Sequence, residues 1–155
     1  MQLPPPAPAD SVPATQVAAL CWRLRKDQVE VLLITSRDTG RWVIPKGWPM
    51  SGLSDAAAAA REAWEEAGVE GQTGSTPLGQ YLYDKITRPS NALRCAVEVF
   101  ALQVEALRNR FPERKQRRRK WFGAAEAALL VAEPDLRQLL DLIDQRPDVL
   151  TAPRA

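Results

Sequence analysis

The sequence predicts an α/β protein in which a mixed β-sheet packs against helices. Two observations lead to this: apolar runs typical of strands lie both before and after one central helix, and two further helices are expected near the end of the chain. A hairpin among the strands means that the sheet cannot be wholly parallel. The 155 residues suffice for one domain that buries a core without disulfide bonds.

The first half of the chain is expected to begin with a β-hairpin. Residues 16–24 form an apolar run that reads as a buried strand, 25–28 form a turn, and 29–35 form the second strand. A short strand at 41–44 ends at Pro45 and Gly47, and a loop rich in glycine and proline follows over residues 47–52.

A helix is expected from Ser54 or Asp55 to Ala67. Ser54 and Asp55 are both suitable N-cap residues, and Gly68 stands where a left-handed C-cap residue belongs. Five consecutive alanines at 56–60 give the segment a strong helix propensity.

The second half is expected to add three strands and two helices, and the termini to form tails. Residues 1–13, which carry five prolines, are expected to be disordered, residues 14–146 to form the domain, and residues 147–155 to form a C-terminal tail. The expected strands are 78–86, 93–104 and 120–122, and the expected helices are 126–131 and 135–144.

The composition excludes several kinds of chemistry. The chain has no histidine, which rules out Ser-His-Asp and Cys-His catalysis and histidine-bound zinc. Cys21 and Cys95 lie in apolar strands and are expected to be buried thiols in a reducing compartment. No apolar run reaches the about 18 residues that span a bilayer, and the N-terminus lacks the features of a secretory signal. We therefore expect a cytoplasmic protein with no membrane association.

Carboxylates remain as the groups that can bind metal or transfer protons. Glu62, Glu65 and Glu66 have the spacing i, i+3, i+4, so their side chains share one helix face, and Arg61 could pair with one of them. Mg²⁺ or Mn²⁺ would relieve their mutual repulsion. By spacing alone, the same pattern also suits a solvated helix face.

The stretch from Gly47 to Val69 resembles the Nudix box. That pattern consists of Gly, five residues, Glu, seven residues and then Arg-Glu-apolar-x-Glu-Glu-x-Gly-apolar. The chain departs from it at one position, where Leu53 replaces the first glutamate. The positions in register are Gly47, Arg61, Glu62, Ala63, Glu65, Glu66, Gly68 and Val69.

The resemblance implies a Nudix-type α/β/α sandwich with a catalytic loop–helix–loop. It implies that Glu62, Glu65 and Glu66, with the carbonyl of Gly47, bind Mg²⁺ or Mn²⁺, and that these glutamates and Arg61 form the catalytic group. The implied reaction is hydrolysis of a diphosphate linkage. The general base stays open among the glutamates of the helix and residues outside the box, for which Glu98 and Glu113 are candidates.

A wider resemblance, over roughly residues 15–145, concerns the substrate. Residues 41–48 and the Arg-rich run that ends at 120–122 resemble the branch of diphosphoinositol polyphosphate and diadenosine polyphosphate hydrolases. Eight basic residues against one acid at 108–120 suit a polyanionic small molecule. Nucleic acid is a secondary candidate partner for this segment. The expected substrate-binding residues are Arg37, Arg41, Lys46, Arg117 and Arg119.

Two alternatives remain open at this point. An RNA 5′-pyrophosphohydrolase or a nucleotide-sanitising enzyme would use the same helix with a different pocket. A non-catalytic Nudix fold that binds polyphosphate or RNA is the other alternative, and Leu53 is the feature that favours it.

Overall fold

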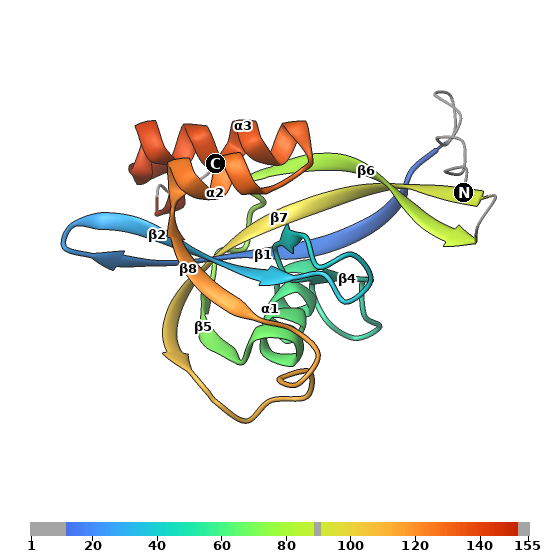
Figure 1. Ribbon diagram of the computed structural model, residues 1–155, viewed down its shortest axis with the longest axis horizontal. Helices are drawn as coiled ribbons and strands as arrows, with labels where there is room; N and C mark the ends of the chain where they lie inside the picture. Colours follow the sequence, from blue (N-terminus) through green and yellow to red (C-terminus); the bar gives the residue numbers. More distant parts are fainter. Residues whose placement is uncertain (1–11, 89–90, 152–155) are drawn as a thin grey trace.

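The computed structural model describes residues 12–88 and 91–151. Within this part, an eight-stranded sheet lies between helices on its two faces, as expected (Figure 1). The strands are β1 (Ala14–Arg25), β2 (Gln28–Thr35), β3 (Trp42–Val43), β4 (Lys46–Gly47), β5 (Val69–Thr73), β6 (Gly79–Arg88), β7 (Asn91–Leu107) and β8 (Arg119–Gly123). The helices are α1 (Asp55–Ala67), α2 (Ala124–Leu130), α3 (Pro134–Gln145) and the short 3-10 helix η1 (Pro147–Leu150).

The sheet is mixed, which confirms the prediction from the sequence. Its main path runs β3-β2-β1-β7-β5, with β4 paired to β1, β6 to β7 and β8 to β2. The central pair β1 and β7 is parallel, whereas the other pairs are antiparallel. The parallel pair joins segments about 80 residues apart in the sequence, for example Val17 with Glu98.

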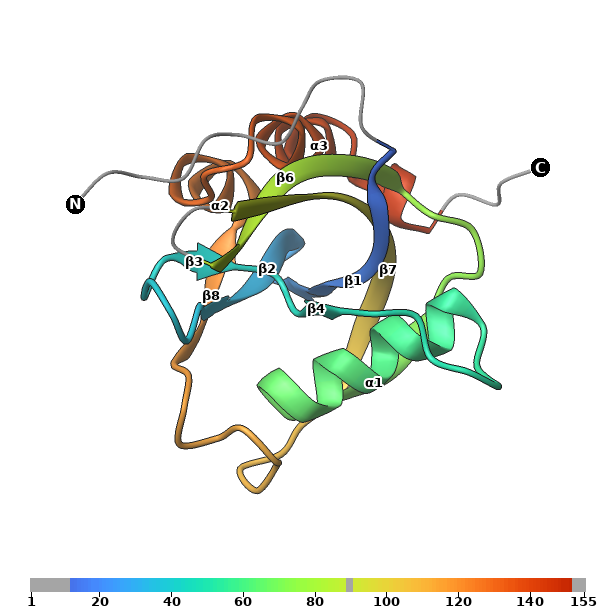
Figure 2. The same cartoon turned by 90° about the vertical axis from the view of Figure 1, so that its right-hand side faces the viewer.

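The sheet buries both of its faces. Figure 2 shows α1 on one side and α2 and α3 on the other. Alternate residues of β1 supply the two cores: Val17 and Ala19 pack in the cluster with α1, and Ala18 and Leu20 in the cluster with α2 and α3. This follows from the two-residue period of a strand, and it explains why β1 reads as a continuous apolar run.

Helix α1 begins and ends where the sequence predicts. The Ser54 hydroxyl accepts a hydrogen bond from the Ala57 N–H at 3.1 Å, and Gly68 has φ +69°. Four alanines, at 58, 59, 63 and 67, are fully buried against the sheet. Their small side chains let the helix pack close to β1, which fixes the distance between the glutamates of α1 and the sheet.

Three features differ from expectation. Residues 46–47 form a strand, β4, where a loop was expected, because they pair with Val17 and Ala18 of β1. Residues 69–73 form β5, which the sequence did not predict, since the segment is polar and carries a bulge after Glu70. At the start of the expected C-terminal tail, residues 147–150 form η1, and Leu150 is buried against the α2–α3 side of the core.

The remaining expectations concern the termini and the cysteines. Most of the expected N-terminal tail lies outside the described residues. Cys21 and Cys95 are free and buried, as predicted. None of the helices in the described part of the chain is long and apolar enough to cross a membrane.

Candidate active site

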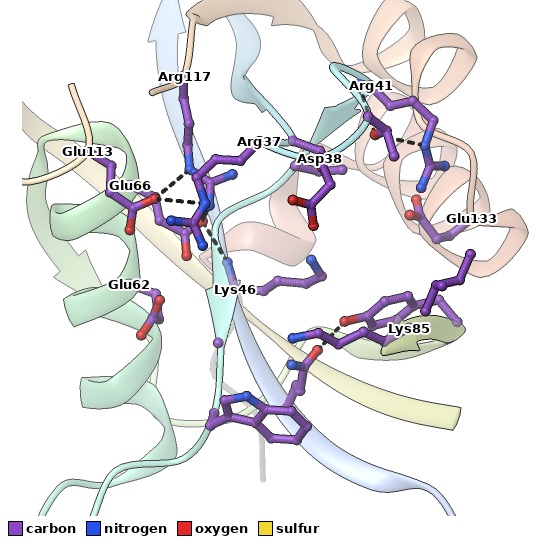
Figure 3. Close-up of a pocket in the computed structure, with 18 of the residues that line it drawn as sticks. Arg37, Asp38, Arg41, Lys46, Glu62, Glu66, Lys85, Glu113, Arg117 and Glu133 are labelled. Atoms are coloured by element: carbon purple, nitrogen blue, oxygen red, sulfur yellow. Dashed lines mark hydrogen bonds and ion pairs between the residues drawn. The ribbon is translucent and has the colours of Figure 1, made fainter. Parts of the chain in front are cut away.

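A cavity of about 730 Å³ opens beside α1, at the ends of β2, β3 and β4 (Figure 3). It has the size of a small-molecule site. Acidic residues from α1 and from the segment before β8 line one side, basic residues line the middle, and β6 with the start of α3 closes the other side. The charged lining residues are Arg37, Asp38, Arg41, Lys46, Glu62, Glu66, Asp84, Lys85, Glu113, Arg117 and Glu133.

Glu62 and Glu66 form a carboxyl pair on α1 next to Gly47. One helical turn separates them, and their side chains share a hydrogen bond. Gly47 faces Glu62 so closely that a Cβ at residue 47 would lie 2.6 and 2.7 Å from its two carboxyl oxygens. The absence of a side chain at residue 47 therefore makes room for the Glu62 carboxyl.

Both carboxyls hold protons more tightly than free glutamate does. Burial, followed by the hydrogen bond to Glu62, raises the pKa of Glu66 to about 9, although Arg117 opposes this. Burial also raises the pKa of Glu62, and the hydrogen bond to Glu66 opposes that shift. Two buried carboxyls that share a proton can exchange it for a cation.

The residues fit a hard divalent cation in part. Glu62 and Glu66 offer adjacent carboxyl oxygens, which Mg²⁺ and Mn²⁺ prefer, and Mg²⁺ needs only one or two carboxylates when substrate phosphates complete its shell. Glu65 is half-buried and does not line the cavity, and the described residues hold no ready group of three metal-ligating side chains. A three-glutamate site therefore requires the Glu65 side chain to turn toward Glu62.

Arg61 lies at the surface of α1. Its side chain is exposed and makes no ion pair within the described part of the chain, so the expected pairing with a neighbouring glutamate is not present here. Leu53, at the position of the missing box glutamate, is 39% exposed in the loop before α1.

Four of the five expected substrate-binding residues line the cavity: Arg37, Arg41, Lys46 and Arg117. The Arg117 side chain is 11% exposed, and it lies 2.9 Å from Glu113 and 3.7 Å from Glu66. It also donates a hydrogen bond to the carbonyl of residue 35 at 3.1 Å. These contacts fix the guanidinium between the side chains of Glu113 and Glu66, which keeps a positive charge at the cavity wall.

Lys46 stands near the centre of the cavity in Figure 3. Its backbone N–H lies 3.4 Å from Glu66 Oε1, and its ammonium lies 5.0 Å from the centre of the Tyr83 ring. Burial lowers the pKa of Lys46, while the negative charges of Glu66 and Glu133 oppose that shift. This lysine is therefore held between acidic groups on two sides.

The fifth expected residue, Arg119, lies outside the cavity lining. It donates a 2.6 Å hydrogen bond to the Ala67 carbonyl at the end of α1 and a 3.2 Å bond to Asn109. Its guanidinium also lies 5.0 Å from the ring centre of Phe111. A cation at the carboxyl end of a helix satisfies a free carbonyl there and interacts favourably with the helix dipole. The position of Arg119 gives it this helix-end role.

The two candidates for a general base outside the box differ in position. Glu113 lines the cavity but is engaged in ion pairs with Arg117 and Arg37. Its backbone N–H bonds to the carbonyl of Glu65, which ties the basic loop to α1. Glu98 is half-buried in β7 and is not part of the cavity lining.

Sequence reasoning missed several cavity residues. Glu133 directly precedes α3, and Lys85 and Tyr83 come from β6, so all three lie outside the box. Glu133 falls between the two expected C-terminal helices, where no local pattern marks a glutamate as buried. The Tyr83 hydroxyl donates a 2.6 Å hydrogen bond to Gln16, so β6 and β1 together form this wall.

Fold and site define an α/β/α sandwich in which the acidic helix α1 faces a cavity lined by both acidic and basic side chains. The chain belongs to the Nudix family, since the NUDIX domain matches residues 14–143. It is 36% identical over 104 residues to Nudix hydrolase 12, mitochondrial, of Arabidopsis thaliana, a match that covers 65% of this chain and 51% of the relative. It is 30% identical over 114 residues to diphosphoinositol polyphosphate phosphohydrolase 3-alpha of Homo sapiens, covering 72% and 65%.

Solved structures agree on the fold. The crystal structure of C. elegans Ap4A hydrolase superposes with a TM-score of 0.60 at 16% identity, covering 84% of this chain and 95% of that one. The E. coli dihydroneopterin triphosphate pyrophosphohydrolase gives 0.65 at 18% identity, covering 84% and 94%. At these identities the likeness establishes the fold alone. The match spans about half the length of Nudix hydrolases 12 and 13 of Arabidopsis thaliana.

Proposed function

We propose that this protein is a Nudix pyrophosphohydrolase, which uses Mg²⁺ or Mn²⁺ to hydrolyse a diphosphate linkage in a phosphorylated small molecule. The observation that carries the proposal is the Glu62–Glu66 carboxyl pair, which faces Gly47 in a cavity that also holds Lys46 and Arg117. Acidic groups for a cation and basic groups for phosphate thus meet in one site.

The residues of this chain would divide the work as follows. Glu62 and Glu66, with Glu65 turned inward and the Gly47 carbonyl, would hold the divalent ion. Once bound, that ion would neutralise charge on the phosphate oxygens and act as a Lewis acid. Arg117, which is held by Glu113 and Glu66, and Lys46, whose backbone N–H contacts Glu66, would orient the diphosphate in the cavity.

Other cavity residues suit the rest of the substrate. Arg37 and Arg41 come from the β2–β3 segment, and their partly free guanidinium groups can contact further phosphates. Charge of this kind supports a densely phosphorylated substrate, either a diphosphoinositol polyphosphate or a dinucleoside polyphosphate. The human relative whose name includes diphosphoinositol polyphosphate phosphohydrolase supports the first, and the fold of the Ap4A hydrolase is compatible with the second.

A substrate panel with a metal titration tests the proposal. The full chain is incubated with a diphosphoinositol polyphosphate, diadenosine tetraphosphate and 5′-triphosphorylated RNA, with Mg²⁺ or Mn²⁺, and the release of phosphate or nucleotide is measured. We expect metal-dependent release from at least one small molecule and a loss of roughly 100-fold or more in Glu66→Gln. Glu105→Gln is the control, because Glu105 is exposed on β7 and does not line the cavity.

The other outcomes favour the alternatives. Release from RNA but from neither small molecule would identify an RNA 5′-pyrophosphohydrolase. If no compound is hydrolysed faster than by Glu66→Gln, the protein is a non-catalytic Nudix fold and the proposal fails.

A further inference from the structure

Glu133 is a buried carboxylate that has no role in the proposed metal and diphosphate binding. It directly precedes α3, lines the cavity and is only 9% exposed. Its Oε2 atom is buried and has no hydrogen-bond partner within the described residues. Burying a polar oxygen without a hydrogen bond costs free energy. We therefore expect a hydrogen-bond donor from outside the chain to bind at this oxygen.

A local structural role does not account for this side chain. Glu133 occupies the N-cap position of α3, yet its side chain makes no capping hydrogen bond. Its backbone carbonyl accepts the first bond of the helix, from the N–H of Arg137 at 3.0 Å, without help from the carboxylate. Pro134 fixes the chain at the first helical position. The backbone therefore forms the helix start, while the carboxylate points into the cavity (Figure 3).

Glu133 places an acidic group on the side of the cavity that lies away from α1. In Figure 3 it lies across the cavity from Glu62, Glu66 and Glu113, with Lys46 between the two sides. When the diphosphate binds beside the α1 glutamates and Arg117, the other end of the substrate would lie near Glu133. A second phosphate there would meet a buried carboxylate, and like charges at close range oppose binding.

A carboxylate accepts hydrogen bonds and donates none, so its partner must carry an N–H or O–H group. Sugar hydroxyls and the amino groups of nucleobases are such groups, whereas a ring whose hydroxyls are all phosphorylated presents anionic phosphates in their place. Trp48, which is 43% exposed, and Tyr83 line the same cavity and supply aromatic surface for a base.

We propose that Glu133 determines specificity: it accepts a hydrogen bond from an uncharged, nucleoside-like group joined to the diphosphate and excludes a phosphate from that position. The proposal rests on the proposed function, because binding of the diphosphate beside α1 determines the direction in which the substrate lies. It selects nucleoside diphosphate derivatives, including dinucleoside polyphosphates, over inositol polyphosphates.

Equilibrium binding tests the proposal without requiring turnover. The dissociation constants of adenosine 5′-diphosphate and of inorganic triphosphate are measured by calorimetry with Mg²⁺, for the wild type, Glu133→Gln, Glu133→Lys and Glu126→Gln. Glu126 is exposed in α2 and does not line the cavity, so it controls for the loss of one negative charge.

We expect the wild type to prefer the nucleotide. The preference should fall roughly 10-fold or more in Glu133→Gln, reverse in Glu133→Lys and stay unchanged in Glu126→Gln. A wild type with no nucleotide preference, or a preference unchanged by both substitutions, overturns the proposal.

Hydrolysis by the wild type is measured separately on the panel described above. Failure of the proposed function would appear there as no turnover of any compound. Failure of the Glu133 proposal would appear as an unchanged ratio of dissociation constants, whether or not turnover occurs.

Discussion

Replacing Gly47 by alanine is expected to impair the candidate active site while leaving the stability of the fold nearly unchanged. The new Cβ would lie 2.6 and 2.7 Å from the oxygens of Glu62, which is about 0.8 Å closer than ordinary contact at 3.4 Å. The atoms in its way belong to the free end of a flexible side chain, and Gly47 does not have a positive φ. Glu62 should therefore swing aside while the backbone stays in place.

The expected effects follow from that displacement. A shift of this size in a catalytic group costs roughly 100-fold in rate, so kcat/KM should fall by about that factor and the Kd for Mn²⁺ should rise. The free energy of unfolding should change by less than about 1 kcal/mol, since alanine at an unstrained glycine position also restricts the unfolded chain. Steady-state kinetics, Mn²⁺ titration and urea denaturation measure the three quantities.

Gly74→Ala is the matched control. Gly74 has no positive φ, and a Cβ there would meet no atom within 4 Å, so rate and metal affinity should stay unchanged. Unchanged metal affinity and rate in Gly47→Ala would refute the reasoning. So would a loss of several kcal/mol in unfolding free energy, because it would mean that Gly47 serves the fold rather than the site.

Three further predictions concern the surroundings of α1. Gly68→Ala should lower the free energy of unfolding by about 2 kcal/mol or more, because residue 68 has φ +69° and a Cβ there would press against Phe111. An unchanged midpoint of urea denaturation would contradict this. Arg117→Met should cost roughly 3 kcal/mol, since it leaves the Glu113 carboxylate without its buried partner and removes the guanidinium beside the Glu66 carboxyl; a loss below 1 kcal/mol would show that the Arg117–Glu113 pair is not buried in solution. In metal-free protein, the free energy of unfolding should fall as pH rises from about 5 to 9, because the folded state keeps a proton on Glu66 that the unfolded state has lost. The free energy of unfolding should change by at most about 1.4 kcal/mol per pH unit. In Glu66→Gln this dependence on pH should be weaker.

The parts of the fold that could be predicted are those with local signals. Helix α1 was placed correctly because Ser54 caps its start, Gly68 ends it and alanines fill it. Strands with long apolar runs, such as β1 and β2, were also found, with bounds that differ by a few residues. The hairpin of β1 and β2 was predicted, but the parallel pairing of β1 with β7 was not, because it joins distant segments and leaves no local pattern.

The candidate site was predicted where a motif names the residue. Glu62, Glu66 and Gly47 are adjacent in the structure as the Nudix resemblance implies, whereas Glu65 lies outside the cavity lining. Charge alone was a weaker guide. The basic loop supplies Arg117 to the cavity but places Arg119 at the end of α1, and only the packing of the loop distinguishes the two.

The central claim is that the carboxyl pair of α1 supports attack of water on a diphosphate. Its most direct test is hydrolysis in ¹⁸O-labelled water with Mg²⁺ or Mn²⁺, followed by ³¹P NMR, for the wild type and for Glu62→Gln and Glu66→Gln. We expect one phosphorus-containing product of the wild type to carry one ¹⁸O and both variants to be slower by roughly 100-fold or more. Equal rates in the variants, or no labelled product from any diphosphate, would contradict it.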